Sequence, residues 1–216
     1  MTRLTASGIR RRLALAAGVA VWAVAVLAGS RVLLNFEGTP GLPGAPPRHW
    51  PAAGLIARSN TAHTLVVLAH PDCPCTRATL VELASIMAQL RGKVISYVIF
   101  SKPDASGGDV KESELWHAAA RIPGVTPIFD PQSIETERFG GHVSGQTILY
   151  DPKGNLVFSG GITSARGHEG DNDGADAILR GVTGQKGSLA STPVFGCSLH
   201  NPGASPRNED PSWNGR

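Results

Sequence analysis

The stretch from Thr64 to Arg91 constrains the fold more than any other part of this 216-residue chain. Its apolar run Leu65 to Ala69 is short enough for a buried strand. Beyond it, apolar residues recur at the spacing of one helical face, at Leu80, Leu83, Ala84, Met87 and Leu90. The tripeptide Cys73-Pro74-Cys75 therefore lies where a strand passes into a helix.

A thiol at the start of a helix meets unpaired backbone N–H groups and the positive end of the helix dipole. Both favour thiolate over thiol. The position of Cys73 and Cys75 therefore predicts thiol chemistry. His70 would lower a nearby cysteine pKa if protonated, or be a solvated loop residue. Asp72 is expected to cap the helix, with a proton-shuttle role as the alternative.

The charge balance argues against nucleic acid as a partner. The pI near 9.0 depends on Arg3 and Arg10 to Arg12, without which 16 basic residues face 17 acidic ones. Such a near-neutral body has no basic groove for phosphates. No Gly-rich phosphate loop follows a strand, so we expect no organic cofactor.

The N-terminus predicts export. A basic segment, residues 1–12, precedes an apolar stretch, residues 13–34, that is long enough for a transmembrane anchor or signal sequence. The positive flank should stay in the cytoplasm. The domain is then membrane-anchored on the periplasmic or extracytoplasmic side, and cleavage after Ala28 is the alternative.

The remaining chain divides into three parts. Residues 35–59 are rich in proline and glycine and predict an extended tether. Residues 60–198 form the expected domain, and residues 199–216 a disordered tail. Within the domain we expect the order βαβαβαββα, with helices on both faces of a central sheet. After the first strand and helix, the ranges are 93–100, 110–121, 125–129, 131–139, 145–150, 155–159 and 175–181.

Two segments resemble the thioredoxin superfamily. Ala69-His70-Pro71-Asp72-Cys73-Pro74-Cys75 is similar to its active-site segment, and Val143 to Tyr150 with the Lys153-Gly154 turn resembles its closing hairpin. The combination is similar to a membrane-tethered Cys-Pro-Cys group, RedB-like, related to TlpA-type and peroxiredoxin-like proteins. The resemblance implies an α/β fold, a thioredoxin-like central mixed β-sheet flanked by helices. In that match Cys73 lies at the position of the family's glycine, and Asp72 lies at the position of its usual nucleophile. Gln146 lies at the position of the cis-proline.

The predicted function is an exported, membrane-tethered thiol–disulfide oxidoreductase. Cys73 should attack and Cys75 resolve, with Pro74 between them, exchanging with exported protein thiols or disulfides and a membrane thiol donor. A small Cys-x-Cys ring is strained and therefore more oxidising. Cys197 is accessory: it resolves a mixed disulfide, pairs with Cys75, or is a buried free thiol. The alternative for the Cys-Pro-Cys pair is inert thiols or a static clip.

Two other functions stay open. Two thiolates with Cys197 or His70 would suit Cu(I), as in a periplasmic copper-binding or metallochaperone protein, although we assign no metal ligand. A thiol peroxidase is the second. Such a site needs Thr or Ser three residues before its cysteine, but that position is His70 for Cys73 and Asp72 for Cys75. The polar loop 168–173 is explained by capping and turns, with a binding role as its alternative.

Overall fold

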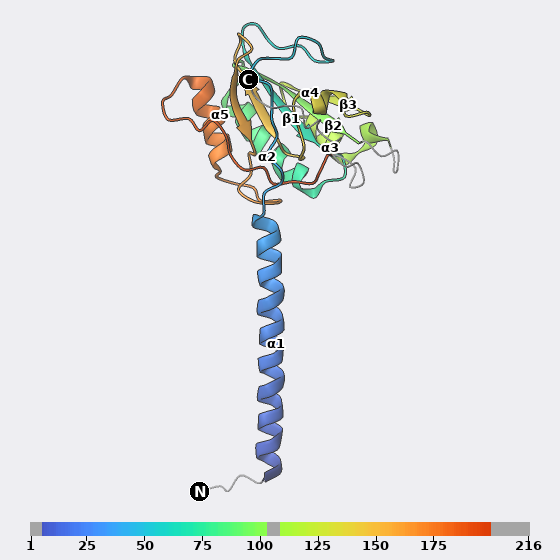
Figure 1. The fold of residues 1–216 in the computed structure, drawn as a ribbon, viewed down its shortest axis with the longest axis vertical. Coiled ribbons are helices and arrows are strands. Elements are labelled where there is room, and N and C mark those ends of the chain that lie inside the picture. The colour runs from blue at the N-terminus through green and yellow to red at the C-terminus, as the bar shows by residue number, and fades with distance from the viewer. Residues whose placement is uncertain (1–5, 103–108, 200–216) are drawn as a thin grey trace, which may run out of the picture. The chain divides into compact units, whose positions relative to one another are not determined.

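The computed structural model describes residues 6–102 and 109–199 (Figure 1). The chain forms two compact units, Met1–Thr39 and Pro40–Arg216. We describe each unit by itself.

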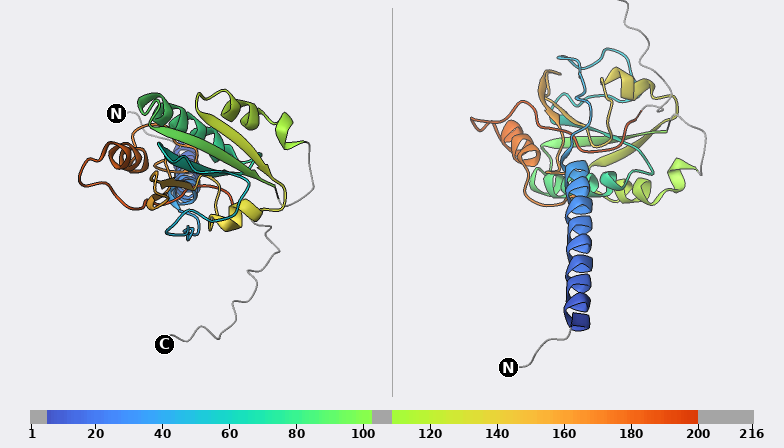
Figure 2. Two further views of the ribbon diagram at one scale, coloured as in Figure 1. Left: turned by 90° about the horizontal axis from the view of Figure 1, so that it is seen from above. Right: turned by 60° about the horizontal axis from the view of Figure 1, so that its bottom comes forward.

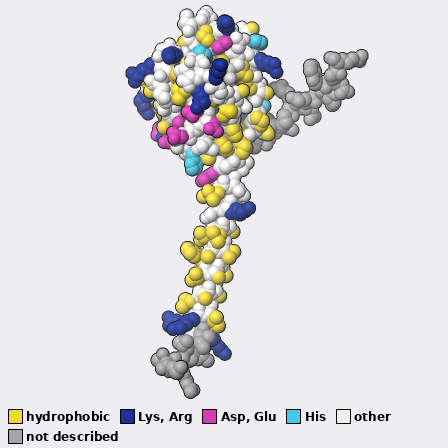
Figure 3. Space-filling model, turned by 90° about the vertical axis from the view of Figure 1, so that its left-hand side faces the viewer, with side chains coloured by type: hydrophobic (Ala, Val, Ile, Leu, Met, Phe, Trp, Pro, Cys, Tyr) yellow, Lys and Arg dark blue, Asp and Glu magenta, His cyan; other side chains and the backbone are white. Residues whose placement is uncertain are grey.

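The first unit is the helix α1 (Ala6–Gly38). Within its segment Arg10–Gly38, a window of 18 residues has a mean hydropathy of 2.1, and none of that window is buried within the protein. Apolar side chains cover its length and arginines lie at its start (Figure 3). At 33 residues and about 1.5 Å per residue, the helix exceeds the roughly 30 Å of a bilayer's hydrocarbon core. The N-terminal helix is thus long and apolar enough to span a membrane.

The second unit is built on a mixed five-stranded sheet with the order β3-β2-β1-β4-β5. Its strands are β1 (His63–Ala69), β2 (Val94–Ser101), β3 (Val125–Asp130), β4 (Thr147–Tyr150) and β5 (Leu156–Gly160). The first three strands are parallel, whereas β4 is antiparallel to both β1 and β5. This confirms the expected order of strands and helices and the expected mixed central sheet flanked by helices.

The helices of the domain are α2 (Pro74–Gln89), α3 (Glu114–Ala120), α4 (Ile134–Arg138) and α5 (Asp173–Thr183). A single helix was expected over residues 110–121. Instead a 3₁₀ turn, η1 (Val110–Glu112), precedes α3. Ser113 separates them because its hydroxyl accepts a hydrogen bond from the Trp116 N–H and caps α3.

Side chains of the central strand β1 alternate between two cores, as the period of a strand requires. Leu65, Val67 and Ala69 contact the core that contains α2, α3 and α5. Val66 and Leu68 contact the core on the other face. Helices α2 and α3 lie on one side of the sheet and α4 on the other (Figure 2). Both faces of β1 are therefore buried, which explains its unbroken apolar sequence.

The proline-rich segment is not the free tether expected for residues 35–59. Helix α1 continues to Gly38, and the compact domain begins at Pro40. The Trp50 ring lies 5.2 Å from the rings of Phe139 and Tyr150, and the backbone N–H of Trp50 donates to the Gly154 carbonyl at 2.8 Å. Aromatic burial and backbone pairing therefore hold the segment against the sheet.

The C-terminal boundary also differs by one residue from the expected one. Leu199, placed in the predicted disordered tail, is fully buried and its N–H bonds the His142 carbonyl at 2.9 Å. The rest of that tail, residues 200–216, lies outside the described residues.

Replacing Trp50 by Ala should release the segment that precedes it. The half-buried ring contributes roughly 1–3 kcal/mol, so trypsin should cut the full-length chain in detergent faster after the exposed Arg48. Leu42→Ala is the matched control, because Leu42 lies in the same segment and is 74% exposed. Equal cleavage of W50A, L42A and the unmodified chain would show that the ring does not anchor the segment.

Candidate active site

The cysteine-bearing turn begins α2 in a way that corrects one expectation. Cys73, not Asp72, is the N-cap residue, with an extended backbone at φ −88° and ψ 119°. Pro74 follows at the first helical position, where its missing N–H costs nothing. Cys75 lies in the first turn. Both thiols are buried, with Cys73 1% and Cys75 8% exposed.

The residues before Cys73 form a turn of their own. The Nδ1 atom of His70 accepts a hydrogen bond from the Asp72 N–H at 3.1 Å. The carboxylate of Asp72 pairs with the Lys102 ammonium at 3.0 Å, which draws it away from the capping position. The His70 ring therefore stabilises the turn that leads into Cys73.

Ser144 joins this turn to the loop before β4. Its hydroxyl accepts from the His70 N–H at 3.1 Å and contacts the Thr76 hydroxyl at 2.9 Å. The Thr76 hydroxyl also bonds the His70 carbonyl at 3.1 Å. These buried contacts fix the start of α2 against the sheet.

A C-terminal segment, residues 190–199, crosses the site, and we call it the C-terminal strap. It pairs with two parts of the domain, through the bridges Ser159↔Ser191 and Val143↔Ser198. At its centre the Ser144 N–H bonds the Cys197 carbonyl at 2.8 Å. A Cβ atom on Gly196 would lie 1.8 Å from the Ser144 carbonyl oxygen, so only glycine permits this approach.

The strap brings the third cysteine to the first. The sulfur of Cys197 lies 2.8 Å from that of Cys73, although 124 positions separate them in the sequence. Cys197 is exposed whereas Cys73 is buried. All three cysteines are free thiols. Of the roles expected for Cys197, a buried free thiol is therefore wrong.

The surroundings of Cys73 favour its thiolate. Burial raises its pKa, but hydrogen bonds from the Cys197 side chain and from the backbone of Cys197, Cys75 and Thr76 outweigh burial, and the net shift is downward. Two of these groups, the backbone N–H groups of Cys75 and Thr76, belong to the first turn of α2, at the positive end of its dipole. The expected effect of the helix start therefore acts on Cys73.

The other two thiols are held protonated. Burial, followed by the charge and hydrogen bond of Cys73, raises the pKa of Cys75. Burial and the hydrogen bond and charge of Cys73 raise the pKa of Cys197 to about 12. The Arg166 guanidinium opposes both shifts. Cys73 is thus the thiol of this cluster that ionises most readily.

Arg166 reaches the site from the polar loop before α5. Its guanidinium donates to the Gly196 carbonyl at 2.5 Å. The loop is fastened by the buried Glu82 of α2, which accepts from the Gly170 N–H at 2.6 Å and the Asn172 amide at 3.3 Å. Asn172 also caps α5 by accepting from the Ala175 N–H at 2.8 Å. Capping and loop anchoring account for this loop.

Gln146 lies directly before β4 and is fully buried. Its backbone carbonyl accepts from the Leu68 N–H at 2.9 Å. Neither side-chain amide atom has a hydrogen-bond partner among residues 6–102 and 109–199, and a Cβ on Gly44 would lie 2.1 Å from this amide. The proline-rich segment therefore covers Gln146.

Among the predicted site residues, the structure brings together Cys73, Cys75 and Cys197. Sequence reasoning missed Ser144, Thr76 and Arg166. The loop that bears Arg166 was noticed only for its concentration of polar residues, and nothing local indicates that it faces the thiols. Within residues 6–102 and 109–199, no group of three or more His, Cys, Asp or Glu side chains has the arrangement of a metal site.

No protein-family model matches the chain, and no curated protein matches its sequence. Several solved structures, however, are similar to this chain in their fold. A hypothetical protein from Sinorhizobium meliloti 1021 superposes with a TM-score of 0.55 at 20% identity, covering 74% of this chain and 93% of that chain. An uncharacterized conserved protein from Geobacillus kaustophilus gives 0.55 at 15% identity, with 78% and 95% covered. A secreted Mycobacterium tuberculosis disulfide oxidoreductase gives 0.42 at 14% identity, with 58% and 83% covered. These likenesses concern the fold.

The Cys197→Ala substitution should raise the pKa of Cys73. It removes the largest of the contributions that lower that pKa, the hydrogen bond from the Cys197 side chain. The measurement compares the Cys75→Ala protein with the Cys75→Ala, Cys197→Ala double variant, in which Cys73 is the remaining thiol. The thiolate absorbance of Cys73 at 240 nm should appear at higher pH in the double variant. An unchanged midpoint would mean that Cys197 does not stabilise the Cys73 thiolate.

Proposed function

We propose that this protein is an exported, membrane-tethered thiol–disulfide oxidoreductase that works through Cys73 and Cys197. The observation that carries the proposal is the 2.8 Å contact between their sulfurs at the start of α2. A thiolate stabilised by helix N–H groups beside a second thiol is what disulfide exchange requires. The proposal replaces the expected Cys73–Cys75 pair.

The position of Cys75 supports this choice. A bridge from Cys73 to Cys75 would close a ring through Pro74 alone, and both Pro74 and Cys75 belong to the first turn of α2. Such a small ring is strained. Cys197 instead approaches from a separate segment, whose backbone is held by its own hydrogen bonds.

The cellular side of the proposal rests on α1 and its charges. The helix is long and apolar enough to anchor the chain, and Arg10 to Arg12 precede its apolar part. Basic residues flanking a membrane helix stay in the cytoplasm, which places the thiol domain outside. The exchange partners are then exported protein thiols or disulfides, together with a membrane thiol donor.

A reduction titration of the full-length chain in detergent tests the chemistry. In glutathione buffers of varied poise, we expect a reversible loss of two thiols, mapped by alkylation and mass spectrometry to Cys73 and Cys197. Cys73→Ser should abolish it, because no low-pKa thiol remains. If C73S behaves as the parent does, or another pair of thiols is lost, the Cys73–Cys197 assignment is wrong. If no two thiols pair at any poise, the chain is not an exchange enzyme.

Labelling of intact cells tests the orientation. A membrane-impermeant maleimide should label the exposed Cys197 without lysis, since the domain lies outside. In the C197S variant, labelling should fall to the level of the buried Cys73 and Cys75. Labelling that appears only after the cells are lysed would place the domain in the cytoplasm.

A further inference from the structure

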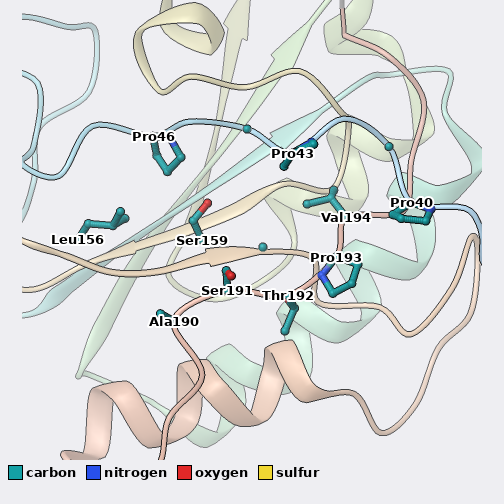
Figure 4. Close-up of a pocket in the computed structure, with 13 residues that line it drawn as sticks. Pro40, Pro43, Pro46, Leu156, Ser159, Ala190, Ser191, Thr192, Pro193 and Val194 are labelled. Atoms are coloured by element: carbon teal, nitrogen blue, oxygen red, sulfur yellow. The ribbon is translucent and has the colours of Figure 1, made fainter. Parts of the chain in front are cut away.

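The C-terminal strap is supported on both sides close to Cys197. The Gly41 N–H bonds the Val194 carbonyl at 2.8 Å, and the Gly161 N–H bonds the Pro193 carbonyl at 3.2 Å. Figure 4 shows Pro40 and Pro43 beside Val194, and Ser159 is bridged to Ser191 through the backbone. A groove of about 440 Å³ lies between these segments. Backbone hydrogen bonds therefore fix the part of the strap that leads to Cys197.

The two cysteine residues differ sharply in exposure. Cys73 is 1% exposed, whereas Cys197 is exposed. In a Cys73–Cys197 disulfide at this place, an approaching molecule meets the sulfur of Cys197 first. Attack there releases Cys73 as the leaving group, into the hydrogen bonds from Cys75 and Thr76 that already surround it.

We propose that Cys197 is the entry sulfur of this site and that the oxidised protein takes electrons from partner thiols, with buried Cys73 as the leaving thiolate. This inference rests on the thiol–disulfide exchange proposed above and adds its direction and its order of events. The partner is a protein carrying two free thiols that become a disulfide.

The step balances as follows. A partner thiolate attacks the Cys197 sulfur, a bond forms between them, and the Cys73–Cys197 bond breaks with its electron pair on Cys73. A second partner thiol loses its proton to solvent and attacks the partner sulfur of the mixed disulfide. Cys197 then leaves and is protonated. The partner is oxidised by two electrons, and Cys73 and Cys197 are reduced.

The charges around the site favour this direction. The groups that face Cys197 are Cys73, Cys75 and Arg166. The leaving Cys73 has a lowered pKa, and thiols of lower pKa leave faster. In the reverse direction Cys197 would be the attacking thiol, and its pKa of about 12 leaves almost no thiolate at neutral pH. A stabilised reduced form makes a disulfide oxidising.

The test follows single turnovers of the full-length chain in detergent. The oxidised protein is mixed with excess reduced glutathione, quenched with acid within the first turnover, and mapped by mass spectrometry. We expect glutathione on Cys197 with Cys73 free, both in the parent and in the matched variant Cys75→Ala. Glutathione oxidation by the oxidised chain should exceed the reverse reaction, from reduced chain and glutathione disulfide, about tenfold or more.

The outcomes separate the two proposals. Glutathione found mainly on Cys73 or Cys75, or a reverse reaction faster than the forward one, overturns the entry role of Cys197 while exchange itself stands. A chain that reacts with glutathione in neither direction overturns the oxidoreductase function and this inference with it.

Discussion

The backbone pairing between the C-terminal strap and the loop before β4 is the interaction on which the thiol site depends. The bond from the Ser144 N–H to the Cys197 carbonyl fixes the strap, and Gly196 allows the approach. Ser144 also holds the turn before Cys73 through His70 and Thr76. Ser144 therefore holds both the turn that leads into Cys73 and the strap that carries Cys197 to the loop before β4. Any shift of this loop would separate them.

Local pattern predicted most of the domain, because its elements obey local rules. The apolar run at β1 and the helical spacing after Cys75 each reflect burial on known faces. The contact between Cys73 and Cys197 could not be predicted in this way. It joins positions 124 residues apart, and its cause is a strap whose sequence has no strand or helix pattern. Asp72 was misjudged for a similar reason, since its partner Lys102 comes from the end of another strand.

The proline-rich segment shows how composition can mislead. Proline removes a donor but leaves a carbonyl, and the Pro47 carbonyl accepts from the Tyr150 hydroxyl at 2.9 Å. Trp50 then supplies the apolar contact that a flexible linker would lack. The segment covers Gln146, whose amide has no hydrogen-bond partner within the described part of the chain, a cost of roughly 1–3 kcal/mol for a buried group. Docking of the segment must therefore be worth more than this.

The long sequence separation of Cys73 and Cys197 has an energetic consequence for the redox poise. A disulfide between them would close a loop of 124 residues. The loop lowers the conformational entropy of the unfolded chain and so raises the free energy of that state by about 5 kcal/mol. By linkage, this stabilisation makes the disulfide harder to reduce in the folded chain than in the unfolded one, by about 100 mV. Stabilisation of the Cys73 thiolate acts in the opposite direction. The reduction potential is then set by a balance between chain topology and a few hydrogen bonds to one sulfur, and unfolding would shift it.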